Sequence, residues 1–390
     1  MNIKRPGTIA VIVNNAGGRI FPSETFLTAH INQMPAPVVP LVGIPGHRIL
    51  IHEDGKTIPD RSAIPLGLRW LARRAGFSTV ASQDRKAFAR FLNQRNICAV
   101  VAEYGPTAVS VMDACRDASV PLIAHFHGFD AYTDDVLENY KEKYLKLFEQ
   151  AAAVIAVSRH MKAQLLSLGA SDERTYVNAC GADIPKGAQA HPQSSDIRFL
   201  MVGRLVEKKA PFLSLIAFAK LAETFPNARL DVVGDGVLLN ACRQIATALG
   251  VAHQVTFHGA QPHAKVFELM RVSRCFIQHS VRTENNDHEG TPVGLLEAMG
   301  MGLPAVSTRH GGISDVIRDG VTGSLIDEYD VDGMSNAMLA YAEDAALAQR
   351  CGDAARLEVS EQWTTQLSIN RLYDIITASM SGGRCAEPAG

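Results

Sequence analysis

Short apolar segments alternate with longer amphipathic segments along the whole chain. In the first half, the apolar segments predict β-strands at residues 9–13, 38–42, 99–102, 122–125 and 154–157. The segments between these strands carry helical patterns of apolar residues. Strands that alternate with helices in this way are typical of α/β proteins with parallel sheets.

The same alternation resumes in the second half of the chain. The predicted elements are strands at 197–205, 228–236, 254–260 and 275–280, and helices at 211–225, 237–250 and 265–272. The two series together predict two Rossmann-like domains whose parallel sheets face a central cleft. Because ligands of open α/β sheets bind outside the carboxyl ends of the strands, candidate site residues should follow strands closely.

Polar, turn-rich stretches indicate where the domains begin and end. Residues 185–195 lack periodicity and are typical of an interdomain linker, and the last ten residues are small and polar. The predicted organisation is an N-terminal Rossmann-like domain at 1–185, a linker at 186–196, a C-terminal Rossmann-like domain at 197–362, a helix at 363–380 that crosses back to the N-terminal domain, and a disordered tail at 381–390.

Composition and charge exclude several classes of protein. The 390 residues carry 38 basic and 40 acidic side chains, a formal net charge of -2, so there is no global basic surface for nucleic acid. Any anion site must be local. The seven cysteines are scattered without a CxxC pair, which favours a cytoplasmic protein. No apolar run is long enough to span a bilayer, and the run at residues 8–13 leads into a Gly-rich turn that favours a buried strand over a signal peptide.

Glu297 is the only charged residue between Gly290 and Thr308. A buried carboxylate without a partner is costly, so Glu297 needs either a ligand or a buried Arg or Lys from elsewhere in the chain. Thr291 as N-cap, Pro292 at the first helical position and a stop after Gly300 predict a helix at 292–300. The free amides at the start of such a helix attract anions such as phosphate.

The stretch "VGRLVEKK" places three cations where a strand ends and a helix begins. Arg204 offers a planar fork for phosphate oxygens, and Lys209 a mobile charge. The alternative is a solvated charge cluster paired with Glu207. Glu289 and the amides that follow it lie at the equivalent end of a later strand. This favours a diphosphate site.

The first half offers weaker candidates. In "HFHGFD", His127 follows a predicted strand and is a candidate ligand contact, whereas His125 lies within the strand and is predicted to be a core histidine satisfied by the backbone. Gly17 and Gly18 follow the first strand and could bring backbone amides to a phosphate or a sugar. The chain lacks the GxGxxG, GxxxxGK[ST] and GxSxG motifs, which disfavours dinucleotide enzymes, P-loop ATPases and nucleophile-elbow hydrolases.

No metal site is predicted. The histidines of the second half that follow strands or begin helices do not show HExxH spacing, and no cysteine pair shows CxxC spacing. The histidines considered are His258, His263, His279 and His288.

A series of motifs in one order resembles the retaining glycosyltransferases of family 4, which have the GT-B fold. The motifs are "GRLVEKK", "EGTPVGLLEAMGMGLPAVST" and "GGISDVIRDGVTGSLI". The resemblance covers residues 8–380 in layout and is strongest at 197–345. "FPSETF" and "HFHGFD" resemble the branch that builds exopolysaccharide, capsule or O-antigen. The chain departs from the pattern by two fewer residues between Pro22 and Ser23, and by Ala210 where Gly is common.

Carried over position by position, the resemblance implies a donor site. Arg204 and Lys209 would hold the donor diphosphate and compensate the charge of the leaving nucleotide. Glu289 would contact the hydroxyls of the transferred sugar, and Glu297 would accept hydrogen bonds from the ribose. The further contacts implied are His127 with the sugar, Gly17 and Gly18 with the diphosphate, and the backbone of Gly203, Gly290, Thr291, Pro292 and Val293 with sugar and phosphate.

The resemblance also implies the reaction. The expected enzyme moves a sugar, with retention, from a nucleotide diphosphate donor to a glycan or lipid-linked acceptor in cell-surface polysaccharide biosynthesis. UDP-sugar is the first expectation for the donor and GDP-sugar the second, with no divalent metal and no cofactor. The alternatives are a GT-B-like sugar-nucleotide epimerase and a non-catalytic sugar-nucleotide-binding subunit. A lipid-linked acceptor would bring the protein to the inner face of the membrane, although the basic residues of segment 139–148 read as a solvated face.

Overall fold

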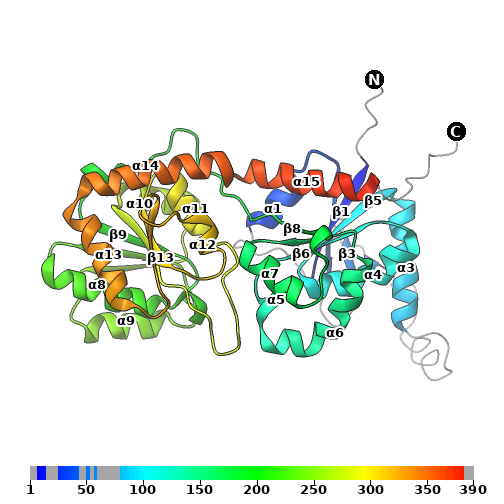
Figure 1. Cartoon of the computed structure of the whole chain (residues 1–390), viewed down its shortest axis with the longest axis horizontal. Helices are drawn as coiled ribbons and strands as arrows, with labels where there is room; N and C mark the ends of the chain where they lie inside the picture. The colour runs from blue at the N-terminus through cyan, green and yellow to red at the C-terminus, as the bar shows by residue number, and fades with distance from the viewer. Residues whose placement is uncertain (1–6, 15–24, 44–49, 53–56, 59–79, 382–390) are drawn as a thin grey trace. The chain divides into compact units, whose positions relative to one another are not determined.

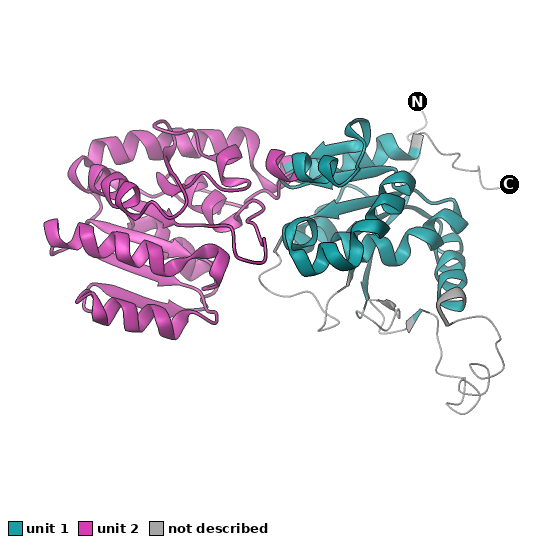
Figure 2. Ribbon diagram, turned by 60° about the horizontal axis from the view of Figure 1, so that its bottom comes forward, with its two compact units in different colours: residues 1–157, 162–178, 368–390 teal, residues 158–161, 179–367 magenta. Residues whose placement is uncertain are grey.

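The computed structural model of the protein describes residues 7–14, 25–43, 50–52, 57–58 and 80–381 (Figure 1). The chain forms two compact units, each a sheet with helices packed on it (Figure 2). Unit 1 comprises residues 1–157, 162–178 and 368–390, and unit 2 comprises residues 158–161 and 179–367.

Unit 1 is built on an eight-stranded sheet with the order β4-β3-β2-β1-β5-β6-β7-β8. Its strands are β1 (Thr8–Asn14), β2 (Val38–Gly43), β3 (Leu50–His52), β4 (Thr57–Ile58), β5 (Ile97–Glu103), β6 (Leu122–Phe126), β7 (Ala153–Ala156) and β8 (Thr175–Val177). All pairings from β2 to β8 are parallel, as predicted. The antiparallel strands β3 and β4 were not predicted, because two or three residues are too few to show a period of two.

Helices cover the sheet of unit 1. They are α1 (Thr25–Asn32), α3 (Val80–Gln94), α4 (Gly105–Ala118), α5 (Phe129–Tyr132), α6 (Asp134–Gln150), α7 (Arg159–Ser167), the 3-10 turn η1 (Asp172–Arg174) and α15 (Thr365–Ser381). The last helix, α15, begins in unit 2 and belongs to unit 1 from Ser368 onward. Its residues Ile369, Leu372 and Ile376 are buried in one cluster with Ile9 and Val11 of β1.

Unit 2 is built on a six-stranded, fully parallel sheet with the order β11-β10-β9-β12-β13-β14. Its strands are β9 (Arg198–Val202), β10 (Arg229–Val233), β11 (Val255–Gly259), β12 (Cys275–Gln278), β13 (Ala305–Thr308) and β14 (Gly323–Ile326). The chain adds strands on one side of β9 as far as β11, and then on the other side from β12 to β14. The strand order therefore reverses between β9 and β12, which is where open α/β sheets bind ligands.

Both faces of this sheet are buried. Along β9, Phe199 and Met201 contribute to one core cluster and Leu200 to another. This period of two explains why the strand is a continuous apolar run in the sequence. The helices and 3-10 turns of unit 2 are η2 (Pro192–Ser194), η3 (Glu207–Lys209), α8 (Pro211–Thr224), α9 (Leu239–Ala248), α10 (His263–Val272), α11 (Val293–Gly300), α12 (Ile313–Val316), α13 (Val331–Glu343) and α14 (Ala345–Gln362).

Residues 186–196, for which the sequence predicts a linker, belong to unit 2. Ala190 is fully buried, and its N–H donates to the carbonyl of Met301 at 2.7 Å. Over the described ranges, no helix combines the length and hydropathy that a membrane span requires.

Candidate active site

Three side chains meet where the strand order of unit 2 reverses. Lys209 ends the 3-10 turn η3 that follows β9, Gln278 is the last residue of β12, and Glu289 lies in the loop that follows β12. The Lys209 Nζ atom lies 2.6 Å from Glu289 Oε2 and 3.3 Å from Gln278 Oε1. The sequence predicted Lys209 and Glu289 as site residues but missed Gln278. The sequence feature that could have identified Gln278 is a polar residue at the end of an apolar strand. In the structure the Gln278 side chain is 2% exposed.

The charges of Lys209 and Glu289 stabilise each other. Burial lowers the pKa of Lys209, and the Glu289 carboxylate opposes that shift. Burial alone would raise the pKa of Glu289, but the ammonium groups of Lys209 and Lys208 hold it below its usual range. The pair is therefore an ion pair near neutral pH. A Lys ammonium has three N–H donors, and two are directed at Glu289 and Gln278, which leaves one for an anion.

The peptide of Glu289 is held by the loop that follows β13. Its N–H donates to His310 Nε2 at 3.0 Å, and His310 Nδ1 lies 2.6 Å from Glu328 Oε1. His310 therefore accepts on Nε2 and carries its proton on Nδ1. The N–H of Gly312 donates to the carbonyl of Gly290 at 2.8 Å. His310 was not predicted, although it directly precedes the Gly311-Gly312 pair of the sequence motif.

Arg204 is exposed in the loop after β9 and makes no hydrogen bond or ion pair with the described residues. Backbone packing holds this loop: a Cβ added at Gly234 would lie 1.9 Å from the carbonyl oxygen of Gly203. Lys208 pairs with Asp287 at 3.1 Å. The alternative of a cation cluster paired with Glu207 is therefore not observed in the described part of the chain.

The helix predicted at 292–300 is α11, Val293–Gly300, with Pro292 at the N-cap instead of the first helical position. The predicted N-cap, Thr291, lies one residue too early, because Pro292 has an extended backbone. Pro292 has no N–H and offers no donor, and the N–H groups of Leu295 and Leu296 donate to the Pro292 carbonyl, so the available amides are those of Val293 and Gly294.

Glu297 is buried on α11 and has a partner in the structure. His263, the first residue of α10, places Nδ1 3.3 Å from Glu297 Oε1. The hydrogen bond to Glu297 raises the pKa of His263. The sequence left open a ligand or a buried Arg or Lys as the partner. The structure shows that the partner is the half-exposed His263. The second carboxylate oxygen of Glu297 has no ion pair among the described residues.

In unit 1, His127 is bound to a buried carboxylate. Its Nε2 lies 2.7 Å from Glu103 Oε2, and its ring stacks on Phe26 at 4.4 Å between centroids. Burial and the neighbouring His125 lower the pKa of His127 to about 3, so the ring is neutral. Glu103 was missed, although it ends an apolar strand much as Glu297 ends an apolar run. The two other predicted contacts of this unit, Gly17 and Gly18, lie outside the described residues.

His125 corrects a prediction. It is buried in β6, as expected, but its ring makes no hydrogen bond to the backbone. The side chain faces Glu103, with Nδ1 3.1 Å from Oε2. The register of β6 against β5 pairs His125 with Glu103, so the ring meets this carboxylate instead of a backbone group.

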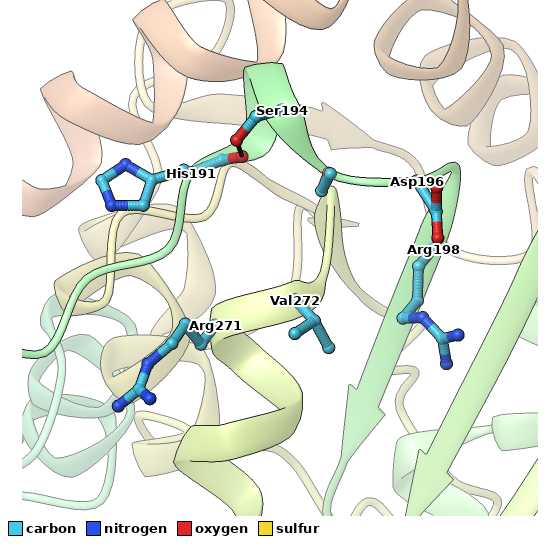
Figure 3. Close-up of a pocket in the computed structure, with 7 residues that line it drawn as sticks. His191, Ser194, Asp196, Arg198, Arg271 and Val272 are labelled. Atoms are coloured by element: carbon cyan, nitrogen blue, oxygen red, sulfur yellow. Dashed lines mark hydrogen bonds between the residues drawn. The ribbon is translucent and has the colours of Figure 1, made fainter.

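A pocket in unit 2 lies away from these residues (Figure 3). Arg198, at the start of β9, lines it, whereas Lys209 and Gln278 lie at the carboxyl ends of β9 and β12. Arg198 is already paired with Asp231 at 2.7 Å. The other residues that line the pocket are His191, Ser194, Ser195, Asp196, Arg271 and Val272. The pocket is therefore distinct from the site at the strand reversal.

Comparison with known proteins agrees with this geometry. Residues 186–358 match the family model of glycosyl transferases group 1, and residues 46–186 match that of glycosyltransferase family 4. The amylovoran biosynthesis glycosyltransferase AmsK of Erwinia amylovora is 28% identical over 260 residues, which cover 64% of this chain and 62% of AmsK. WcaL of Escherichia coli (strain K12), a glycosyltransferase assigned to colanic acid biosynthesis, is 27% identical over 286 residues, which cover 71% of this chain and 70% of WcaL.

Solved structures show the same fold. Anabaena HepE, crystallised with UDP and glucose, matches with a TM-score of 0.68 at 17% identity, covering 95% of this chain and 100% of HepE. The lipopolysaccharide outer core galactosyltransferase WaaB matches with a TM-score of 0.69 at 18% identity, covering 95% of this chain and 99% of WaaB.

The sheets, the strand reversal and these matches define a glycosyltransferase with the GT-B fold. Together the two family models account for the chain from residue 46 to residue 358. The chain is therefore a glycosyltransferase whose first half matches the family 4 model and whose second half matches the group 1 model.

Proposed function

We propose that this enzyme transfers a sugar, with retention of the anomeric configuration, from a UDP-sugar, or as second choice a GDP-sugar, to a glycan or lipid-linked acceptor in cell-surface polysaccharide biosynthesis. The observation that carries the proposal is the group of Lys209, Gln278 and Glu289 at the strand reversal of unit 2, beside the unpaired Arg204. AmsK and WcaL are named for amylovoran and colanic acid biosynthesis, and HepE was crystallised with UDP.

The proposed chemistry is electrostatic. As the bond between sugar and diphosphate breaks, negative charge grows on the departing nucleotide. Arg204, the free donor of Lys209 and the first amides of α11 would surround that charge, with Gly203 allowing close approach of the backbone. These groups would do what a divalent cation does in other transferases. The proposal therefore includes no metal at the diphosphate and no cofactor.

The carboxylates would orient the donor. Glu289 would accept hydrogen bonds from the hydroxyls of the transferred sugar while Lys209 holds its other face. Glu297 would accept from the ribose with the oxygen that His263 does not bind. His127, Gly17 and Gly18 would act from unit 1. A lipid-linked acceptor would make this a peripheral protein of the inner membrane face.

A donor panel tests the proposal. The purified chain is incubated with UDP- and GDP-hexoses and a lipid-linked or oligosaccharide acceptor without added magnesium or manganese, and released nucleotide and product are measured. Glu289→Gln should reduce transfer by at least about 100-fold, in the range of a lost transition-state contact, while nucleoside diphosphate binding stays within about threefold. Glu284→Gln, the same change at an exposed position of the same loop, is the matched control.

The products separate the rival functions. Proton NMR of the first product should show the anomeric configuration of the donor. An altered sugar nucleotide formed from the donor alone would identify an epimerase, and nucleotide binding without turnover of any donor would identify a binding subunit. Either result would overturn the transferase proposal.

A further inference from the structure

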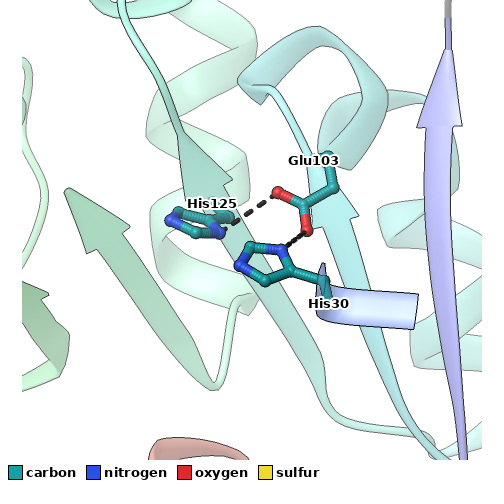
Figure 4. Close-up of side chains that lie close together, drawn as sticks. All are labelled: His30, Glu103 and His125. Carbon is teal, nitrogen blue, oxygen red and sulfur yellow. Dashed lines mark hydrogen bonds and ion pairs between the residues drawn. The ribbon is translucent and has the colours of Figure 1, made fainter. Parts of the chain in front are cut away.

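A second group of ionisable side chains lies buried in unit 1, and none of its members takes part in the proposed donor site. His30 comes from α1, Glu103 from the end of β5 and His125 from β6, and all three point toward one another (Figure 4). Their exposed fractions are 2%, 0% and 1%. His30 Nδ1 lies 2.6 Å from Glu103 Oε1, and His125 Nδ1 lies 3.1 Å from Glu103 Oε2.

Hydrogen bonds explain only part of this group. Glu103 accepts from His30 on Oε1 and from His127 on Oε2. His125 Nδ1 faces Glu103 Oε2, whereas its Nε2 is buried without a hydrogen-bond partner among the described residues. A buried polar group left unpaired costs about 1–3 kcal/mol, so this group of side chains requires an explanation such as a bound water or ion.

We propose that His30, Glu103 and His125 form a zinc site. One ligand atom from each residue lies within 4.8 Å of the other two. Zinc bonds of about 2.0–2.1 Å put tetrahedral ligand atoms about 3.3 Å apart. The 3.1 Å from His125 Nδ1 to Glu103 Oε2 is close to that value, whereas the 2.6 Å from His30 Nδ1 to the other oxygen, Oε1, has to open by less than about 1 Å. The ion therefore replaces the hydrogen bond between His30 and Glu103.

The types of ligand atom determine which metal ion the site binds. Two neutral imidazoles with one carboxylate suit zinc, whereas magnesium and calcium prefer oxygen ligands. His127 does not ligate the ion but donates to Glu103 Oε2, and such a contact orients a ligating carboxylate. A water molecule fills the fourth position. The ion joins α1 to β5 and β6 at the strand ends that carry His127, and its role is to position that segment.

The test begins with metal content. The full chain, expressed without a histidine tag, is dialysed against buffer with micromolar zinc and then against metal-free buffer, and its zinc is counted by mass spectrometry. We expect one zinc per chain. Glu103→Gln, which keeps the side-chain shape but removes the charge, should lower zinc affinity at least about tenfold. His253→Ala removes an exposed histidine of unit 2 and should leave the zinc content unchanged.

Cobalt gives an independent result on the unchanged chain, in case Glu103→Gln does not fold. Cobalt bound at the proposed ligands gives visible d–d bands without the near-ultraviolet charge-transfer bands of a thiolate. Thermal unfolding should shift upward when zinc is added back to the stripped protein. A folded chain that takes up neither zinc nor cobalt, or cobalt spectra with thiolate bands, would overturn the proposal. Nucleotide binding by the stripped chain reports on unit 2 separately.

Discussion

Arg204 is the one cation of the "VGRLVEKK" motif that the structure leaves without a partner among the described residues, since Lys208 and Lys209 are both paired. Arg204→Ala should weaken binding of the preferred nucleoside diphosphate about 10- to 150-fold, because one charge-assisted contact contributes about 1.5–3 kcal/mol. Calorimetric titration measures this. The thermal midpoint of the ligand-free protein should not change.

Arg271→Ala is the control for Arg204→Ala, since Arg271 is also an exposed arginine of unit 2 but lies at the end of α10. It should bind nucleotide as the unchanged protein does. If the two variants bind the nucleotide with equal affinity, Arg204 does not bind its phosphates.

His263 and Glu297 give stability a pH dependence. The pKa of His263 in the folded protein is raised by its hydrogen bond to Glu297. The stabilisation is therefore full below the unfolded pKa of about 6.5, and it is lost as pH rises through the folded value. His263→Ala should lower the thermal midpoint more at pH 5.5 than at pH 8.5. Because the side chain is 54% exposed, the effect should stay below about 1 kcal/mol.

The control for this pH dependence is His253→Ala, which removes an exposed histidine that makes no ion pair among the described residues. Its thermal midpoint should follow the unchanged protein at both pH values. If His263→Ala lowers the thermal midpoint by the same amount at pH 5.5 and at pH 8.5, the ion pair between His263 and Glu297 is contradicted.

One buried carboxylate, Glu297, could be recognised in the sequence, but its partner could not. Glu297 stands out because its neighbours are uncharged, and that observation predicts a partner. The partner, His263, lies on α10, and the register between two helices is set by tertiary packing that no local pattern reports. Glu103 was not recognised in the sequence, and its partners His30 and His127 come from separate elements.

At the scale of elements, the loop after β13 supports the loop that carries Glu289. A Cβ added at Gly312 would lie 2.0 Å from the carbonyl oxygen of Gly290. Gly312→Ala must therefore displace the Glu289–Gly290 segment, although the Gly312 backbone is helical and any residue can adopt it. We expect a loss of about 1–3 kcal/mol in the free energy of unfolding and a strong loss of transfer. Thermal unfolding and the donor assay measure the two effects.

Gly320→Ala is the control that separates the effect of the contact between Gly312 and Gly290 from the effect of backbone strain. Gly320 has φ +72°, and a Cβ there meets no atom within 4 Å. The variant should lose about 1–2 kcal/mol of stability through its left-handed backbone but keep its transfer activity. Normal transfer by Gly312→Ala would show that this loop does not position Glu289.

Strands β1, β2, β5 to β7 and β9 to β12 were predicted because parallel strands buried on two faces are continuous apolar runs, as Phe199, Leu200 and Met201 show in β9. The parallel strands β8, β13 and β14 were not predicted. Helices were predictable from periodicity and stop signals. The start of α11 shifted by one residue, because Pro292 suits both the N-cap and the first helical position. Short strands such as β3 and β4 carry too few residues to show a pattern.

At the scale of the whole molecule, α15 belongs to both units, and its stability role can be separated from the site. Leu372→Ala removes a fully buried side chain from the cluster with β1 and should cost about 2–5 kcal/mol. The thermal midpoint should fall, while nucleoside diphosphate affinity below the transition should stay unchanged. Leu357→Ala, on the exposed face of α14, is the control and should stay within about 0.5 kcal/mol. Similar losses in both variants would contradict the packing of α15.

The alternation of strands and helices predicted the α/β class, and the motif series predicted the family. Neither could predict the group of His30, Glu103 and His125, because its members lie far apart in the chain and none has ligand spacing. The donor and the acceptor could not be predicted either, because a base that is recognised through backbone groups leaves little trace in side-chain identity.

The measurement that tests the central claim most directly is calorimetric titration of the full chain with UDP, GDP and ADP, first with a chelator and then with magnesium. We predict that one nucleotide, with UDP the first expectation, binds selectively, with the same affinity in both buffers. Arg204→Ala should weaken binding of the preferred nucleotide about 10- to 150-fold in both buffers. If no nucleotide binds, or if binding appears only with magnesium, the account of a metal-free diphosphate site around Arg204, Lys209 and Glu289 is contradicted.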